Sequence, residues 1–475
     1  MKTLVDFLIR YRLWLLLAVV VLLPLSYLAA RNLAFDQSIE SLYAEDDEHL
    51  NNYLESKSLF GGDEFVIVAY TDPQLFSPEG TTLSPEGAAR IQELSEKLSQ
   101  IPGVQPESTQ NLDKALKFRW KSSRVKKMVE GMLLGEDQQT TAIVLRLQKE
   151  DVATVSRKET FAAIREIAEA HNPPCFVVGE PLQVHDMFRL VEEDGQTLFL
   201  WSLGLLAFVV LILFRSLRWM ALPLLIVISA ILWTEAVLVL SRIKLSMVSS
   251  MLNSLVTIIG IATVMHVTVH YREQRRERDR SEALKITLSE LLPAIFWTCA
   301  TTSIGFLALL SSSITPVQSF GTMMSLATFF VLLATATILP GGILLGRIDA
   351  DPSMAPAENR LVDLLEGVTR VVNRRPLLVS FGALALVVIA AIGFLFLKVE
   401  TDFSKNFRKS SSIVQSLDFV ETRLGGAGTW EVNFPAPAEL NEEYLEKVGR
   451  FAEKLRIKFL RGDEGKLTKV VALTD

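Results

Sequence analysis

Seven stretches of this chain are apolar over about 20 residues each, and such stretches restrict the folds that are open to it. A helix needs about 20 apolar residues to cross hydrocarbon roughly 30 Å thick. Within that layer every backbone N–H and C=O must be paired inside the protein. The sequence therefore predicts an α-helical membrane bundle of about seven spans, near residues 13–30, 197–214, 219–241, 246–270, 292–311, 320–345 and 376–397.

Long polar segments lie between the first two apolar runs and after the last one. They explain how 475 residues can be 49% hydrophobic and still 21% charged, a mixture typical of a membrane protein with sizeable extramembrane domains. In segment 32–195, strand candidates alternate with helix candidates, which predicts an α/β domain of the split β-α-β type. The strand candidates are 65–70, 141–147 and 175–179, and the helix candidates are 84–100 and 157–170. The net charge of −6 and the two isolated cysteines indicate neither nucleic-acid binding nor a disulfide framework.

The later part of the chain repeats its beginning. Leu4-Val5-Asp6-Phe7 precedes the first apolar run, and Leu361-Val362-Asp363-Leu364 precedes the last one. Phe60-Gly61-Gly62 stands before a strand-like segment, and so does Leu424-Gly425-Gly426. A duplication that contains membrane spans predicts a two-fold transporter architecture with the site between the halves. The second copy stops partway, so we expect a truncated chain, a bit more than half of a transporter.

Basic residues in the short connections predict the orientation, because they concentrate on the cytoplasmic side. Arginines and lysines precede the first run, separate the second and third, follow the fourth, and lie between the sixth and seventh, whereas Arg242 and Lys244 fall on the other side. The N-terminus is therefore expected in the cytoplasm of a bacterial cell, with the large domains in the periplasm. The predicted parts are a first anchor at 1–31, a periplasmic domain at 32–195, a five-helix bundle at 196–348, a cytoplasmic linker at 349–375, a seventh span at 376–398 and the start of a second periplasmic domain at 399–475.

Polar side chains inside apolar runs are costly in hydrocarbon and are candidates for function. The fourth run carries Asn253, Thr257, Thr263 and His266. Histidine changes charge near neutral pH and suits a proton relay. A histidine that is bonded to a neighbouring helix or reached by cytoplasmic water explains the same residue equally well.

Three further proton-path candidates lie in the third and fifth runs. Glu235 lies toward the outer side, roughly 20 Å in depth from His266 at 1.5 Å per residue. It is therefore expected to face an outer vestibule or to meet Asn253. Thr301 and Thr302 either line helix contacts or hold relay water. We predict no catalytic residue, cofactor or metal site, and no enzyme.

The string Gly61-Gly62-Asp63-Glu64-Phe65 matches the diguanylate cyclase signature. Only about thirty residues separate it from the first run, and the predicted topology places it away from cytoplasmic GTP. The second copy keeps the two glycines but follows them with Ala427-Gly428-Thr429. We interpret the string as a tight turn before a strand. No Walker-type phosphate loop occurs either, so transport energy would come from an ion gradient or another subunit.

Several local strings resemble the RND (resistance–nodulation–division) superfamily, and specifically its MMPL-type exporters. The central five spans also resemble a sterol-sensing membrane domain. The matching strings are Phe214-Arg215-Ser216-Leu217-Arg218, Gly260-Ile261-Ala262 with His266 and Tyr271-Arg272-Glu273, Thr301-Thr302 with Gly305-Phe306, and Pro316 with Phe320-Gly321 and Pro340.

The resemblance implies proton-driven export or relocation of lipids or other hydrophobic compounds out of the inner membrane, through the periplasmic domains. It leaves open a homo-oligomer or accessory periplasmic proteins as partners. The family's proton carrier is usually an acid soon after the Gly-Ile pair, where this chain has Thr263-Val264-Met265. Either His266 replaces that acid, the acid lies in the other half, or this member is not proton-driven in the usual way. A lipid receptor or scaffold that does not pump is the alternative.

Overall fold

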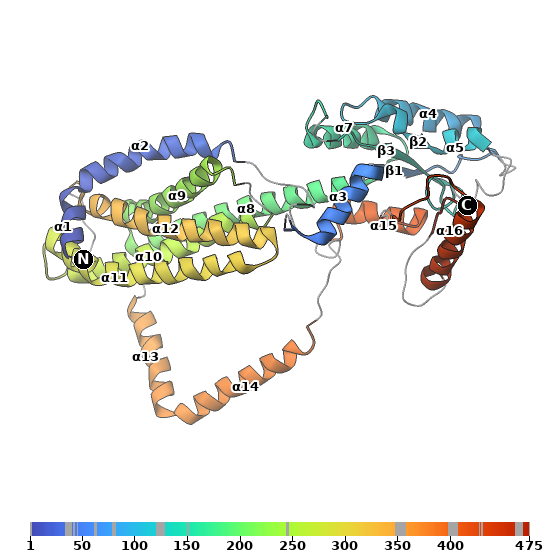
Figure 1. The fold of residues 1–475 in the computed structure, drawn as a ribbon. Helices are drawn as coiled ribbons and strands as arrows, with labels where there is room; N and C mark the ends of the chain where they lie inside the picture. Colours follow the sequence, from blue (N-terminus) through green and yellow to red (C-terminus); the bar gives the residue numbers. More distant parts are fainter. Residues whose placement is uncertain are drawn as a thin grey trace. The chain divides into compact units, whose positions relative to one another are not determined.

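The structure, a computed structural model, contains two compact units, and each is described by itself. The first unit comprises Met1–Asp47 and Phe188–Val399, and the second comprises Glu48–Met187 and Glu400–Asp475. Figure 1 shows the order of their elements along the chain. The structure describes residues 2–33, 40, 43–44, 46–60, 64–77, 82–119, 129–149, 152–243, 247–346, 358–397, 407–426, 428, 431–460 and 469–474.

Seven helices in the described residues are long and apolar enough to cross a membrane, which confirms the predicted membrane bundle. They are α2 (Arg12–Ala30), α8 (Glu180–Phe214), α9 (Leu217–Leu240), α10 (Leu252–Gln274), α11 (Arg280–Leu307), α12 (Thr315–Leu344) and α14 (Pro376–Phe394). Shorter helices accompany them in the first unit: α1 (Lys2–Arg10), η3 (Met247–Met251), η4 (Ala308–Ser311) and α13 (Glu358–Arg374). Lys244, Arg347 and linker residues 349–357 lie outside the described residues.

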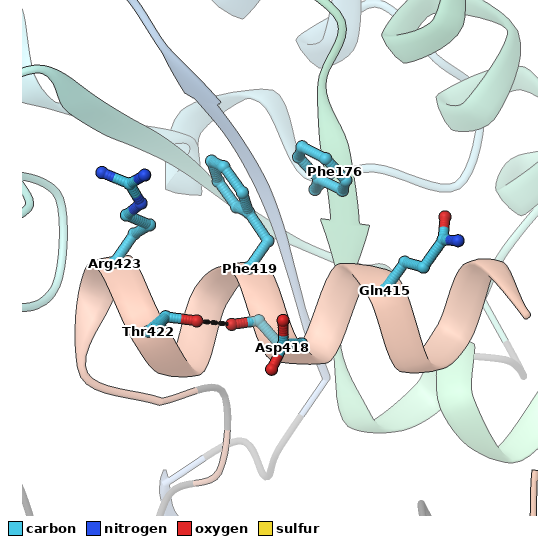
Figure 2. A pocket seen from close by; sticks show the side chains of 6 residues that line it. All are labelled: Phe176, Gln415, Asp418, Phe419, Thr422 and Arg423. Atoms are coloured by element: carbon cyan, nitrogen blue, oxygen red, sulfur yellow. Dashed lines mark hydrogen bonds between the residues drawn. The ribbon is translucent and has the colours of Figure 1, made fainter. Parts of the chain in front are cut away.

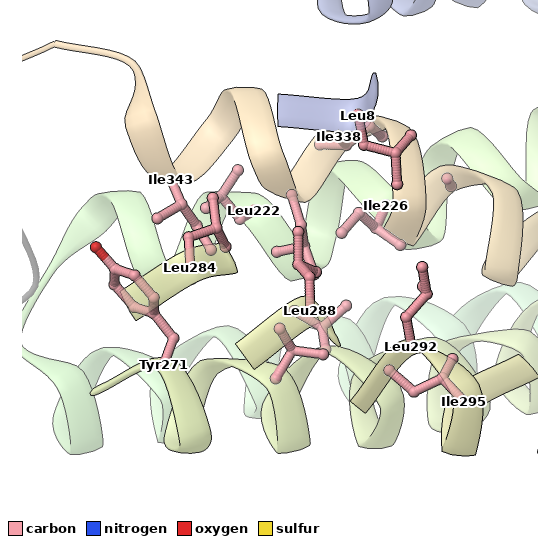
Figure 3. Packing of buried hydrophobic residues seen from close by; sticks show 14 of the residues in the cluster. Leu8, Leu222, Ile226, Tyr271, Leu284, Leu288, Leu292, Ile295, Ile338 and Ile343 are labelled. Atoms are coloured by element: carbon pink, nitrogen blue, oxygen red, sulfur yellow. The ribbon is translucent and has the colours of Figure 1, made fainter. Parts of the chain in front are cut away.

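Helix α12 is the centre of the first unit, because it contacts α2, α9, α10 and α11. Glycines allow two of these contacts to be close. A Cβ atom at Gly342 would lie 2.2 Å from Leu222 Cδ2 on α9, and one at Gly341 would lie 2.4 Å from Leu16 Cδ1 on α2. Small residues at such positions are the usual means of packing membrane helices tightly. Figure 3 shows the aliphatic core that results, with Leu8, Leu222, Ile226, Leu284, Leu288, Leu292, Ile295, Ile338 and Ile343.

Two arginines stabilise the C-terminal end of α12. Arg218 Nε donates to the Gly342 carbonyl at 2.9 Å, and Arg280 donates to the carbonyls of Ile343 at 2.8 Å and Gly346 at 2.7 Å. The last carbonyls of a helix lack intrahelical partners and carry partial negative charge, so cations there are favourable. These arginines, which the sequence analysis used for orientation alone, therefore also join the start of α9 and the start of α11 to the end of α12.

The second unit is built around a four-stranded antiparallel sheet in the order β2-β3-β1-β4. Its strands are β1 (Phe65–Thr71), β2 (Gln110–Asn111), β3 (Thr140–Arg146) and β4 (Phe176–Val178). Helix α4 (Pro85–Ser99) connects β1 toward β2, and α7 (Arg157–Ala170) connects β3 to β4. This is the predicted split β-α-β arrangement. The remaining elements of the unit are α3 (Glu48–Phe60), η2 (Pro106–Ser108), α5 (Leu112–Arg119), α15 (Ser412–Leu424), α16 (Glu442–Leu455) and η6 (Arg456–Leu460).

Strand β1 separates two apolar clusters, since alternate side chains of a strand point to opposite faces. Val66, Val68 and Tyr70 belong to the cluster that includes the buried residues of α4 and α7. Ile67 and Ala69 belong to a second cluster with residues of α15. Helix α15, from the repeated part of the chain, thus covers the sheet face that α4 and α7 leave open.

Phe161 on α7 lies in the first of these clusters and is only 2% exposed. A substitution at this position therefore measures how much the cluster contributes to stability. Replacing Phe161 by Ala removes a large buried side chain and leaves a cavity, so we expect a loss of about 3–5 kcal/mol in unfolding free energy. The measurement is the urea concentration at which a protease begins to cut within residues 48–187. Lys158→Ala, at an exposed position of the same helix, is the control. Equal midpoints for the two variants would show that α7 is not part of the core.

Candidate functional site

The N-terminal half of α10 carries two of the predicted polar residues close together. Thr257 is buried, and its Oγ1 donates to the Asn253 backbone carbonyl at 2.6 Å. The Asn253 Oδ1 atom is buried, and no donor among the described residues reaches it. Buried polar atoms are usually hydrogen-bonded. This amide oxygen therefore marks a place where water or a ligand group would be held.

The C-terminal half of α10 carries a polar stripe, defined here as Thr263, His266 and His270. Their spacing of three and then four residues puts them on one side of the helix. Thr263 Oγ1 donates to the Ile259 carbonyl at 2.9 Å within the same helix, and His266 is exposed on the bundle surface. Val264 and Val267, each adjacent in sequence to a residue of the stripe, are fully buried. Thr263 and His270 are half-buried, so only His266 of the stripe is exposed outside the aliphatic core.

His270 joins the polar stripe to α11. Its Nε2 atom lies 2.7 Å from Glu290 Oε2, and its Nδ1 atom lies 3.9 Å from Glu273 Oε2. The sequence analysis did not include Glu290 among the candidates, although the residue stands directly before the fifth apolar run. A carboxylate two residues from the start of a span was the signal that could have identified it.

Glu235 lies on α9 and is half-buried. In the part of the chain that the structure describes, neither Glu235 nor His266 has a hydrogen bond or an ion pair, so the structure does not join them. The adjacent Thr234 hydroxyl donates to the Ala230 carbonyl at 2.7 Å and offers Glu235 no donor. Glu235 is thus separate from the polar stripe.

The predicted threonines of α11 differ from each other in exposure. Thr301 is exposed and donates to the Trp297 carbonyl at 2.9 Å, whereas Thr302 is half-buried. The neighbouring Ser303 makes a contact between helices: its hydroxyl donates to the Ser325 carbonyl at 2.7 Å and lies 3.0 Å from the Ser325 hydroxyl. The α11–α12 contact therefore uses the hydroxyl of Ser303, and not that of Thr301.

The second unit has an open groove between α15 and β4, with a volume of about 410 Å³. Figure 2 shows its lining: Phe176 from β4, with Gln415, Asp418, Phe419, Thr422 and Arg423 from α15. The Phe176 and Phe419 rings are stacked with centroids 4.1 Å apart. The groove offers an aromatic surface beside one acidic and one basic group. Sequence reasoning could not find it, because its two sides come from distant segments.

Asp137 holds the basic end of this groove in place. Its Oδ2 atom accepts from Arg423 at 3.0 Å, and its Oδ1 atom accepts from the backbone N–H groups of Gln139 and Thr140. Partial burial would raise the pKa of Asp137, but hydrogen bonds from the Thr140 hydroxyl, those two N–H groups and Arg423 outweigh it and hold the pKa below the ordinary value. The carboxylate is therefore charged at neutral pH.

Comparison with known proteins places this arrangement in a family. The model of the MMPL family matches residues 73–379, which include strands β2, β3 and β4 and the spans from α8 to α12. The chain belongs to the MMPL family. A chain of Methanocaldococcus jannaschii, MJ1562, whose name describes a membrane protein, is 29% identical over 185 residues. The match covers 38% of this chain and 47% of that relative, so the chain spans about half of the relative's length.

Within this MMPL-family chain, the cyclase-like string has a structural explanation at Glu64. Gly61, Gly62 and Asp63 lie outside the described residues. The Glu64 carboxylate accepts a hydrogen bond from Arg157 and lies 3.6 Å from Lys57 Nζ. A carboxylate that is paired with two cations beside a strand end contributes to the fold and is poorly placed to hold a metal.

Replacing Asp137 by Asn should weaken the docking of α15 in a pH-dependent way. At pH 7 we expect a loss of about 1 kcal/mol, because the charge-assisted bond to Arg423 is removed. Since the folded-state pKa is lowered, this stabilisation is complete above the unfolded pKa of about 4 and disappears as the pH falls through the folded value. The measurement is the difference in thermal unfolding between D137N and the wild-type second unit, taken at pH 7 and at pH 3.

Glu136→Gln is the matched control, because it removes one negative charge from the same turn at an exposed position. A D137N defect of equal size at both pH values would show that the charge of Asp137 does not contribute.

Proposed function

We propose that this MMPL-family chain takes part in moving lipids or other hydrophobic compounds across or out of a bacterial inner membrane, driven by protons. The supporting observation is the polar stripe on α10. Ionisable side chains such as His266 and His270 are costly inside a membrane-spanning helix and are therefore candidates for function. Histidine is the side chain whose charge changes near physiological pH. The stripe thus supplies a group that can take up and release a proton at membrane depth.

Each candidate residue has a role in this proposal. His266 carries the proton, and His270 with Glu290 exchanges it with the cytoplasmic side. The hydroxyl of Thr263 relays it outward along α10, toward Thr257 and the unpartnered oxygen of Asn253. Thr301 and Thr302 border the path on α11, and Glu235 faces an outer vestibule.

Substrate would meet the second unit at the groove between α15 and β4. The stacked rings of Phe176 and Phe419 suit an apolar chain, and Asp418 and Arg423 suit a polar head group. Helix α8 begins two residues after β4 ends and continues as one 35-residue helix into its apolar half. Helix α8 thus connects the strand next to the groove to a membrane span along the chain.

The proposed arrangement puts the N-terminus in the cytoplasm and segments 32–195 and 399–475 in the periplasm, with the division into domains expected from the sequence. The basic residues of the short connections support this orientation. A homo-oligomer or accessory periplasmic proteins would complete the path beyond the membrane.

A second candidate function is a sterol-sensing-like lipid receptor or scaffold without pumping. The usual acid of the fourth span is absent, and the hydroxyls of Thr257 and Thr263 bond within their own helix. Back-bonded hydroxyls of this kind are satisfied without relay water. A cyclase activity has weaker support, because Glu64 is already paired.

Transport of a fluorescent lipid in vesicles, measured with and without a pH gradient, tests the proposal. Transport should depend on the gradient, and His266→Ala should reduce it to the level without a gradient, because the proton carrier is removed. Val269→Ala, which is exposed on the same helix, is the matched control. Transport that ignores the gradient in the wild type supports the receptor or a different energy source. Unchanged coupling in H266A removes His266 from the mechanism.

A further inference from the structure

Helix α1 directly precedes the first span and presents three distinct faces. It ends at Arg10, and the chain continues into α2 through Tyr11, whose backbone N–H donates to the Phe7 carbonyl at 2.9 Å. Residues that are three and four positions apart lie on one side of a helix. The three faces are a buried face (Val5 and Leu8), an apolar exposed face (Leu4, Phe7 and Tyr11) and a polar exposed face (Thr3, Asp6 and Arg10).

The buried face fixes how α1 is turned about its own axis. Val5 is fully buried and Leu8 is 5% exposed, and both belong to the aliphatic core of the first unit. On the polar exposed face, Asp6 Oδ1 lies 2.7 Å from Lys285 Nζ of α11. The apolar exposed face therefore cannot turn into the bundle unless these contacts are broken.

The apolar exposed face continues the exposed surface of the span α2. Leu4 is 46% exposed, Phe7 49% and Tyr11 41%. The rings of Phe7 and Tyr11 lie with their centroids 4.8 Å apart, and Trp14 and Leu17 of α2 are exposed beyond them. Apolar surface is unfavourable in water, and aromatic side chains concentrate where a membrane meets water. The face is therefore suited to the boundary between lipid headgroups and acyl chains.

The polar exposed face carries a cation that has no acidic partner. Asp6 is paired with Lys285, whereas Arg10 has no ion pair among the described residues. The guanidinium carbon of Arg10 lies 5.7 Å from the centroid of the Tyr11 ring, so the polar face borders the apolar exposed face at this point. Arginine binds phosphate through a planar pair of N–H donors. A phosphate at this border would meet a positive charge that no described side chain neutralises.

We propose that α1 lies in the headgroup layer where α2 enters the membrane, and that Arg10 binds the phosphate of an anionic phospholipid there. Each face then has an environment of matching polarity: the bundle, the acyl chains, or headgroups with water. A zwitterionic lipid also carries a phosphate, but its ammonium group cancels that charge, so an unpaired arginine favours anionic lipid. Continuity with the span selects lipid, and not another protein, as the occupant. This surface does not depend on what the protein transports.

Fluorescence quenching by nitroxide-labelled lipids tests the proposal. The full chain, with Cys175 and Cys299 replaced by Ser, carries Leu4→Cys with the fluorophore NBD attached and is reconstituted in phosphatidylcholine vesicles. A small fraction of either nitroxide-labelled phosphatidylglycerol or nitroxide-labelled phosphatidylcholine is included. We expect phosphatidylglycerol to be preferred near the label by about fivefold, which is the effect of one arginine close to an anionic headgroup.

Substitutions at Arg10 identify the group that binds the lipid. Arg10→Gln should remove the preference, and Arg10→Lys should keep it, because lysine retains the charge. Arg31→Gln is the matched control, since it removes the same charge from an exposed position at the other end of α2. In a separate chain the label is attached through Thr3→Cys, on the polar exposed face. That label should be quenched less by both lipids, and more by aqueous iodide, than the label at position 4.

Three outcomes would overturn the proposal. Equal quenching by the two lipids in the chain with native Arg10 would show that anionic lipid is not preferred. A preference that survives R10Q, or that R31Q removes equally, would show that Arg10 is not the binding group. Quenching of the label at position 4 by iodide and by neither lipid would place α1 in water. These readouts report local contact with lipid, so they can succeed or fail independently of the transport assay.

Discussion

The close approach of helices at glycine is the constraint on which the first unit depends. Between membrane helices the hydrophobic effect supplies little attraction, because lipid is as apolar as the side chains. Van der Waals contact and hydrogen bonds must therefore hold the helices together, and both require short distances between the helices. Gly341 allows α2 to approach α12 closely, and Gly342 does the same for α9. On α10, a Cβ atom at Gly260 would lie 2.8 Å from Val227 Cγ2 on α9. The last contact fixes the rotation of α10, so the orientation of its polar stripe follows from the packing.

Local and periodic features could be predicted from the sequence, and non-local ones could not. Apolar runs of membrane length gave the spans, and the alternation of strands with capped helices gave the split β-α-β sheet, with α7 at the predicted residues. Strand β2 has only two residues and carries no periodic signal. The partners Glu290 and Ser325, and the groove under α15, depend on contacts between distant segments. The direction in which His266 points depends on how α10 packs against its neighbours, and the sequence alone does not show that packing.

Strand β1 joins two apolar clusters, because successive side chains of a strand point to opposite faces. Val66, Val68 and Tyr70 lie in the cluster with residues of α4 and α7. Ile67 and Ala69 lie in the cluster with residues of α15. One short strand thus links the helices on both faces of the sheet.

A histidine that carries protons in the fourth span, as proposed for His266, would meet different electrostatic requirements from those of a carboxylate. A carboxylate is charged when it has lost its proton, so it needs a nearby cation or strong donors in a low-dielectric site. An imidazole is neutral after losing its proton and charged only while it carries one. His266 has neither an ion pair nor a hydrogen bond among the described residues. In the proposed mechanism no partner among these residues would have to be displaced before the imidazole exchanges a proton.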